Sequence, residues 1–193
     1  INQSGQHLLA LINDILDYSQ LSSGELELDC QVVRADQLCD FAVRRVQPTI
    51  TQRNQRFTVE NRAPDAAIWG NAERLTSVLR RLLDNATKFT AEGGELGLRL
   101  VSAASQLRLE VWDRGIGMKP ESLPQLFQPF GQSDSGLARR YQGAGLSLAI
   151  AHRVVALHEG SIEVKSVEGQ GSEFTVVLPL ISAKESLSRR SAG

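Results

Sequence analysis

The stretch Leu82-Leu83-Asp84-Asn85-Ala86-Thr87-Lys88-Phe89-Thr90 is the centre of the most informative pattern in this chain. Three further motifs follow it in a fixed order: Asp113-Arg114-Gly115-Ile116-Gly117-Met118, Phe127-Gln128-Pro129-Phe130 and Gly143-Ala144-Gly145-Leu146-Ser147-Leu148-Ala149-Ile150. Each motif alone is a weak signal, since a lone glycine pair usually marks a turn. The four motifs become informative about the class of protein only when their order and spacing are taken together.

The first motif lies on a predicted helix that Asn71 caps. One face of this helix is apolar, at Leu75, Val78, Leu79, Leu82, Leu83 and Ala86. Another helix is expected after Asp36, which could cap it, and Pro48 should end or kink that helix. A further helix is expected over 145–158, after a loop-rich region over 115–142.

Alternating or β-rich segments around these helices predict strands. The expected strands are 25–29, 57–60, 67–69, 96–101, 107–112, 161–166 and 173–180. The interleaved helices and strands predict an α/β sandwich, in which helices cover one face of a mixed β-sheet.

Residues 1–23 read as a separate helix. Leu8, Ile12, Ile15 and Ser19 recur at spacings of four and three, and Leu9, Leu11 and Leu16 widen this stripe. Such a stripe suits a bundle or coiled coil, but also an amphipathic helix folded onto its own domain. Residues 182–193 are small, polar and charged, so we expect a disordered tail or linker.

Composition limits the class of protein. The 193 residues suggest one domain with a small appendage, and 41% hydrophobic residues suffice for a packed core. A net charge of −1 argues against a nucleic-acid binder, and no apolar run is long enough to span a bilayer. Cys30 and Cys39 lack metal-ligand spacing and look like core residues of a reducing compartment. The start at Ile1 suggests a fragment of a longer protein.

The motifs offer groups that suit a nucleotide, although no P-loop or dinucleotide fingerprint is present. The glycine-rich turn over 143–148 leads into a helix N-terminus, where free amides attract phosphate. Asn85 could ligate Mg²⁺ and Lys88 could offset phosphate charge, but alone the pair could equally be a solvated helix face. Asp113 can only accept hydrogen bonds, so it could take the amino group of adenine and reject guanine. Phe127 and Phe130 could support a lid over 131–142 or simply be core residues.

The four motifs together resemble the N, G1, F and G2 boxes of sensor histidine kinases, within the gyrase-like superfamily of ATPases. The resemblance covers about residues 1–181. It implies a Bergerat-type ATP-binding domain over 24–181, preceded over 1–23 by the second helix of the dimerisation hairpin. It also implies ATP and Mg²⁺ as cofactors, with Asn85 as the metal ligand. The implied nucleotide-binding residues are Asn85, Lys88, Asp113, Gly115, Gly117, Phe130, Arg139, Arg140, Gly143, Gly145 and Leu146.

Two departures from the family pattern matter. Arg81 stands four residues before Asn85, where the family usually has Asn and its hydrolysing relatives have Glu. An arginine cannot act as a general base at neutral pH, which leaves two alternatives for Arg81: contact with phosphate, or an outward orientation. In addition, His7, His152 and His158 all lack the acidic residue and proline that follow the family's phosphoacceptor histidine.

The resemblance therefore implies an ATP-binding catalytic domain without its acceptor. The intact enzyme would transfer the γ-phosphoryl group of Mg·ATP to a histidine, then to a response-regulator receiver domain. It would be a homodimer through the dimerisation hairpin, in the cytoplasm, and this fragment would contact neither membrane nor nucleic acid. The alternative is a non-catalytic, nucleotide-dependent interaction module. In either case nucleotide should order the segment over 133–142.

Overall fold

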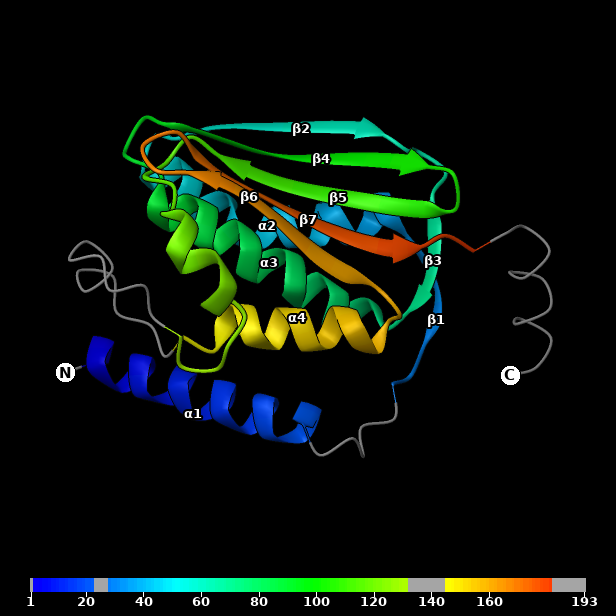
Figure 1. Cartoon of the computed structure of the whole chain (residues 1–193), viewed down its shortest axis with the longest axis horizontal. Coiled ribbons are helices and arrows are strands. Elements are labelled where there is room, and N and C mark those ends of the chain that lie inside the picture. The colour runs from blue at the N-terminus through cyan, green and yellow to red at the C-terminus, as the bar shows by residue number, and fades with distance from the viewer. Residues whose placement is uncertain (1, 23–27, 132–144, 182–193) are drawn as a thin grey trace.

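A mixed β-sheet and a layer of helices make up the fold (Figure 1). The computed structural model describes residues 2–22, 28–131 and 145–181. The sheet has five strands in the order β2-β4-β5-β7-β6. Helices cover one of its faces, as the sequence predicted.

The strands extend the predicted segments by a few residues. They are β2 (Arg56–Arg62), β4 (Glu95–Ala103), β5 (Gln106–Asp113), β6 (Ser161–Val167) and β7 (Gly171–Pro179). Strand β2 pairs parallel to β4, and the other neighbours pair antiparallel. Alternate residues of β5 are buried, so Leu107, Leu109 and Val111 face the helices and Asp113 ends the same row.

The helical layer contains α2 (Ala35–Gln52), α3 (Ala72–Phe89) and α4 (Ser147–Leu157). The side chain of Asn71 caps α3 by accepting a hydrogen bond from the amide of Arg74 at 2.9 Å. Leu82 and Leu83 are fully buried on the face of α3 that the sequence predicted to be apolar. This well-capped helix carries the first motif into the middle of the molecule.

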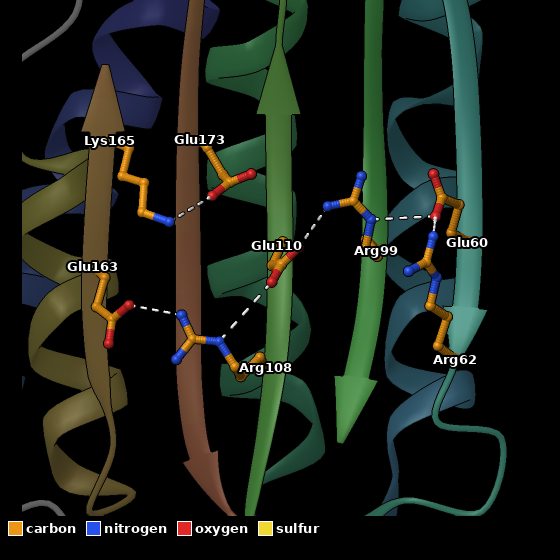
Figure 2. Close-up of polar contacts among 8 residues, drawn as sticks. All are labelled: Glu60, Arg62, Arg99, Arg108, Glu110, Glu163, Lys165 and Glu173. Carbon is orange, nitrogen blue, oxygen red and sulfur yellow. Dashed lines mark hydrogen bonds and ion pairs between the residues drawn. The ribbon is translucent and has the colours of Figure 1, made fainter. Parts of the chain in front are cut away.

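Paired charges cover the opposite face of the sheet (Figure 2). Arg99 bridges Glu60 and Glu110, with nitrogen–oxygen distances of 3.2 and 2.8 Å. Arg108 lies 2.7 Å from Glu163, and 3.9 Å from Glu110. Because charges of opposite sign face each other across the strands, this face is stable in contact with water.

The first predicted strand is wrong. Residues 25–27 lie outside the described part of the chain, and Leu28 and Asp29 are not in a strand. Instead β1 (Gln31–Arg34) pairs with β3 (Ala67–Gly70) in a separate two-stranded sheet. This pairing joins segments more than thirty residues apart, so a local alternation pattern does not locate it.

The ends of α2 also differ from the prediction. Asp36 does not cap the helix, because α2 already begins at Ala35, whose amide donates to the carbonyl of Ala66. Pro48 does not end it either, since α2 continues to Gln52. Proline removes one helical hydrogen bond, and the exposed position of Pro48 leaves the freed carbonyl of Arg44 near water.

The region predicted as loop contains a short 3₁₀ helix, η1 (Pro120–Gln125). Helix α4 begins at Ser147 rather than Gly145, because Gly145 has a φ of +68°, which no α-helix contains. The predicted tail over 182–193 lies outside the described residues.

Helix α1 (Asn2–Ser22) lies beside α4 on the outer side of the helical layer (Figure 1). Leu21 is buried, and Arg153 of α4 donates to its carbonyl at 3.0 Å. The apolar stripe instead stays exposed, with 46–61% of the surface of Leu8, Leu9, Ile12, Ile15 and Leu16 accessible. The helix thus contacts its own domain, but through a different face from the stripe.

His158 links the end of α4 to the start of α3. It is buried, its Nε2 accepts from the amide of Asn71 at 3.0 Å, and its Nδ1 lies 2.7 Å from the carbonyl of Val154. Only a neutral ring protonated on Nδ1 makes both bonds. Burial accordingly lowers the pKa of His158 below its ordinary value of 6.5.

This histidine should make folding stability depend on pH. Because the unfolded chain binds the proton more readily, the contribution of His158 is complete above pH 6.5 and is lost as the pH falls below it. We expect His158→Gln, which keeps an acceptor for Asn71, to reduce the slope of unfolding free energy below pH 6.5. The reduction is at most about 1.4 kcal/mol per pH unit. Denaturant titrations between pH 5 and 8 measure it, and parallel curves for the two proteins would contradict the assignment.

Candidate ATP-binding site

The C-terminal turns of α3 present the first predicted pair. Asn85 and Lys88 are both half-buried there. Burial lowers the pKa of Lys88, and its Nζ lies 5.1 Å from the centre of the Phe89 ring. The neighbouring Asp84 is engaged by Arg80 at 2.9 Å. An amide oxygen and an ammonium group are therefore within one turn of each other on the same helix.

Asp113 ends β5 as a buried carboxylate with 7% of its surface accessible. Burial raises the pKa of Asp113 to about 6, and hydrogen bonds from the backbone amides of Gly115 and Ser172 oppose that rise. The bond from Gly115 measures 2.8 Å. The group is mostly ionised at pH 7, and its two oxygens have acceptor capacity beyond these two donors.

The glycines of the second motif fit between protein backbones. A Cβ on Gly115 would lie 2.3 Å from the carbonyl oxygen of Phe89, at the end of α3. Gly117 has a φ of +60°, and its Cβ would lie 1.9 Å from the carbonyl oxygen of Val167. Only glycine allows this loop to pass between α3 and the β6–β7 turn. Contact of these glycines with a base stays a prediction.

The residues that hold this loop were not predicted from the sequence. The hydroxyl of Ser166 accepts from the amide of Met118 at 2.8 Å, and the amide of Gly169 donates to the carbonyl of Ile116 at 2.7 Å. Ile116 also donates to the carbonyl of Phe89, at 3.3 Å. The Gly169-Gln170-Gly171 turn was the available signal, since two glycines between strands indicate a close approach. The β6–β7 turn thus fixes Asp113 and its loop against α3.

The third and fourth motifs meet at the start of α4. Phe127 packs against the core and against the ring of His152, with ring centres 5.1 Å apart. Phe130 is 65% exposed, and a Cβ on Gly145 would lie 3.0 Å from its backbone. Leu146 is fully buried, so its side chain belongs to the core, and its contact with a nucleotide stays a prediction. The predicted Arg139, Arg140 and Gly143 lie outside the described residues, as does most of the expected lid.

Arg81 does not turn outward. It is buried, and its guanidinium lies 2.9 Å from Asp14 and 3.6 Å from Asp17 on α1. Contact of Arg81 with phosphate stays a prediction. A contact between segments 67 residues apart along the chain is invisible to motif analysis.

A pocket of about 330 Å³ includes Asp113 and Ser166 in its lining, but neither Asn85 nor Lys88. Arg99, Trp112, Lys165 and Glu173 line it. Lys165, Arg99 and Glu173 project from the face of the sheet opposite the helices (Figure 2). The pocket therefore opens away from Asn85 and Lys88, and we assign the candidate site to the helical side.

Comparison with known proteins identifies the domain. Residues 70–182 match the family of histidine kinase-, DNA gyrase B- and HSP90-like ATPases. The chain is 41% identical over 184 residues to the circadian input-output histidine kinase CikA of Thermosynechococcus vestitus, covering 94% of this chain and 25% of that protein. It is 36% identical to the autoinducer 2 sensor kinase/phosphatase LuxQ of Vibrio cholerae, over 92% of this chain and 21% of that protein.

A solved structure supports the same conclusion. Full-length ShkA in complex with AMPPNP superposes with a TM-score of 0.83 and 31% identity, covering 94% of this chain and 37% of that one. The chain spans about a quarter of the length of the curated relatives that it matches. The matched residues include all four motifs and the elements that position them. The chain belongs to the histidine kinase-, DNA gyrase B- and HSP90-like ATPase family, and it is an ATP-binding catalytic domain of the histidine kinase type.

Proposed function

We propose that this domain binds Mg·ATP and transfers the γ-phosphoryl group to a histidine of the dimerisation hairpin, for relay to a response-regulator aspartate. One observation carries the proposal. A buried, acceptor-only carboxylate, Asp113, is held at the end of α3, where Asn85 and Lys88 lie. This arrangement offers a base-reading group and phosphate-binding groups on one side of the fold.

Adenine recognition would fall to Asp113. Its carboxylate can accept a hydrogen bond from the exocyclic amino group of adenine, whereas the carbonyl of guanine would repel it. Burial strengthens this discrimination, because an unmatched polar group in a site without water is costly. Gly115 and Gly117 present no side chain beside Asp113, which would let the backbone at these two positions approach the base closely.

The residues present fit a magnesium ion shared with phosphates. Among residues 2–22, 28–131 and 145–181, no group of three or more His, Cys, Asp or Glu is placed to hold a metal by itself. The half-buried amide of Asn85 supplies one hard oxygen ligand, and Mg²⁺ usually completes its octahedron with waters and phosphate oxygens. Such an ion would neutralise charge on the transferred phosphoryl group.

Lys88 and the start of α4 would hold the phosphates. The desolvated ammonium of Lys88 interacts more strongly with an anion than an exposed lysine would. Gly145 and Leu146 directly precede α4, and the free amides of a helix N-terminus stabilise negative charge. Arg139, Arg140 and Gly143 would add to this cradle, and Phe130 would lie at its edge. The relative ShkA was solved in complex with AMPPNP, which supports nucleotide binding by this domain.

The acceptor histidine would come from outside this chain segment. His158 is buried and uses both ring nitrogens, so it is not available to a phosphoryl group. None of the three histidines matches the acceptor motif. The domain would therefore act by positioning Mg·ATP toward the dimerisation hairpin that carries the acceptor histidine.

Helix α1 would be the second helix of that hairpin, over residues 1–23, with the catalytic domain over 24–181. Its exposed apolar stripe is the type of surface that packs in a helical bundle. In the intact protein this stripe would form the homodimer. The activity would take place in the cytoplasm, because it would depend on ATP and on a receiver domain. Within the described residues no helix is both long and apolar enough to cross a bilayer.

A second candidate function is a non-catalytic module in which nucleotide only changes the interaction surface. Arg81 favours this non-catalytic function, because it stands where the family has Asn or Glu and its guanidinium pairs with Asp14 on α1. Direct hydrolysis by water is disfavoured for the same reason, since arginine is no general base.

One experiment separates these functions. The chain is incubated with Mg·[γ-³²P]ATP and a separately supplied acceptor hairpin that carries the histidine motif. We expect acid-labile phosphohistidine on the hairpin and no labelling of the chain alone. Nucleotide binding without any hairpin labelling would favour the interaction module. Steady release of free phosphate from ATP alone would contradict both.

A further inference from the structure

Four charged side chains join α1 to α3, and we name them the Arg81 cluster. They are Asp14 and Asp17 on α1, and Arg74 and Arg81 on α3. Arg81 lies 2.9 Å from Asp14 and 3.6 Å from Asp17, while Arg74 lies 3.1 Å from Asp17. Asp17 is shared by both arginines, so the four charges act as one network.

The sequence spacing within each pair of the Arg81 cluster places both members on one face of their helix. Asp14 and Asp17 are three residues apart, and Arg74 and Arg81 are seven residues apart, so each pair lies on one helix face. Arg153 adds a third contact by donating to the carbonyl of Leu21 near the end of α1. Cations near a helix C-terminus are stabilising. Together with the buried Leu21 and the partly buried Tyr18, which pack in and against the core, these polar contacts hold α1 in this position, while the apolar stripe stays exposed.

The cluster differs from an ordinary surface ion pair. The side chain of Arg81 is only 9% exposed, and that of Asp14 is 25% exposed. The Nε of Arg81 is buried and has no hydrogen-bond partner within the described residues. A buried guanidinium needs an anion, because leaving it unpaired is strongly destabilising. The two aspartates supply that anion in this arrangement.

Arg81 is also one helical turn before Asn85, about 6 Å along the axis of α3. The two residues lie on neighbouring positions of one face. An arginine side chain can span such a distance and binds phosphate as readily as carboxylate. The triphosphate held near Asn85 under the proposed function would therefore compete with Asp14 and Asp17 for Arg81.

We propose that Arg81 couples the docking of α1 to the nucleotide site. With α1 docked, Asp14 and Asp17 occupy the guanidinium; with nucleotide bound, the phosphates draw Arg81 away and α1 is held less firmly. The inference rests on the proposed function, since it requires phosphates near Asn85. Coupling of this kind is reciprocal, so removing the aspartates must tighten nucleotide binding by the factor by which nucleotide loosens α1.

The test compares nucleotide affinity among matched variants of the whole chain. Calorimetry with Mg·AMPPNP is expected to give about fivefold or tighter binding for Asp14→Asn/Asp17→Asn than for the natural chain. Adding Arg81→Gln to this double variant should abolish the gain. Arg80→Gln is the matched control, because Arg80 neighbours Arg81 but pairs with Asp84. It should not tighten binding.

Hydrogen exchange of α1 amides provides the second readout. We expect Mg·AMPPNP to speed exchange over residues 8–21 of the natural chain. Arg81→Gln alone should also speed exchange but should not tighten nucleotide binding, which distinguishes coupling from a merely structural ion pair. Thermal unfolding of each variant confirms that it is folded.

The outcomes separate the two proposals. A natural chain that does not bind Mg·AMPPNP would overturn the proposed function and this coupling with it. A natural chain that binds, with equal affinity for the double aspartate variant or with α1 exchange unchanged by nucleotide, would overturn the coupling alone. Tighter nucleotide binding that persists after Arg81→Gln is added to the double aspartate variant would also overturn the coupling. The effect would then not pass through Arg81.

Discussion

Asp113→Asn is expected to weaken ATP binding by about ten- to a hundredfold. The change keeps the size of the side chain but replaces one acceptor oxygen with a donor that faces the amino group of the base. A lost hydrogen bond to a charged group costs roughly 1.5–3 kcal/mol, which corresponds to that loss of affinity. Calorimetry with Mg·ATP and Mg·GTP measures the effect. The natural chain should prefer ATP, and equally tight binding of GTP would contradict the role of Asp113.

The stability of this variant provides the control. Because burial raises the pKa of Asp113 to about 6, the native state binds its proton more readily than the unfolded chain does. The ionised carboxylate is therefore a cost to folding above pH 6, and this cost shrinks as the pH falls below about 6 and is gone below 3.8, the ordinary pKa of the side chain. Asp113→Asn should leave the thermal midpoint at pH 7 unchanged or raised. A loss of affinity at an intact midpoint then reports on binding.

The same pKa predicts the pH dependence of binding. Below about pH 6 Asp113 becomes protonated and loses acceptor capacity, so ATP affinity should fall. Asp113→Asn should bind weakly at all pH values and lack this fall. Parallel pH profiles for the two proteins would show that another group is responsible.

The sequence predicted those elements whose signals are local. Helix α3 was predictable because Asn71 caps it and its apolar residues recur at helical spacing. The hairpin of β4 and β5 was also predictable from a local signal, because apolar residues recur at every second position in both strands. Strand β1 was not, because its partner β3 is distant in the chain. Pro48 misled the prediction because its cost depends on exposure, which only the fold determines.

The candidate site shows the same difference between local signals, which the sequence contains, and contacts between distant segments, which only the fold determines. The order of the motifs led to Asn85, Lys88 and Asp113, and the fold gathers them around the end of α3. The support from Ser166 was not predictable, because a serine in a strand end carries no signal of its partner. Arg81 was recognised as a departure, but its pairing with Asp14 depends on how α1 docks.

Asn85→Ala is expected to remove most of the magnesium dependence of ATP binding while leaving the fold intact. In the natural chain Mg²⁺ should strengthen ATP binding, because the ion links the amide oxygen of Asn85 to the phosphates. Loss of this ligand should reduce the strengthening by about tenfold or more. Alanine is the best helix former, and Asn85 is only half-buried, so α3 should persist. Calorimetry with Mg²⁺ and with EDTA measures the difference.

Two neighbouring variants sharpen this test. Asp84→Asn removes the adjacent carboxylate, which pairs with Arg80, and should retain the magnesium dependence. Asn85→Asp keeps an oxygen but adds negative charge beside the phosphates, so it should bind Mg·ATP less tightly than the natural chain yet still respond to Mg²⁺. If Asn85→Ala responds to Mg²⁺ normally and Asp84→Asn does not, the ion is held by Asp84, and the pairing of Asp84 with Arg80 must open when nucleotide binds.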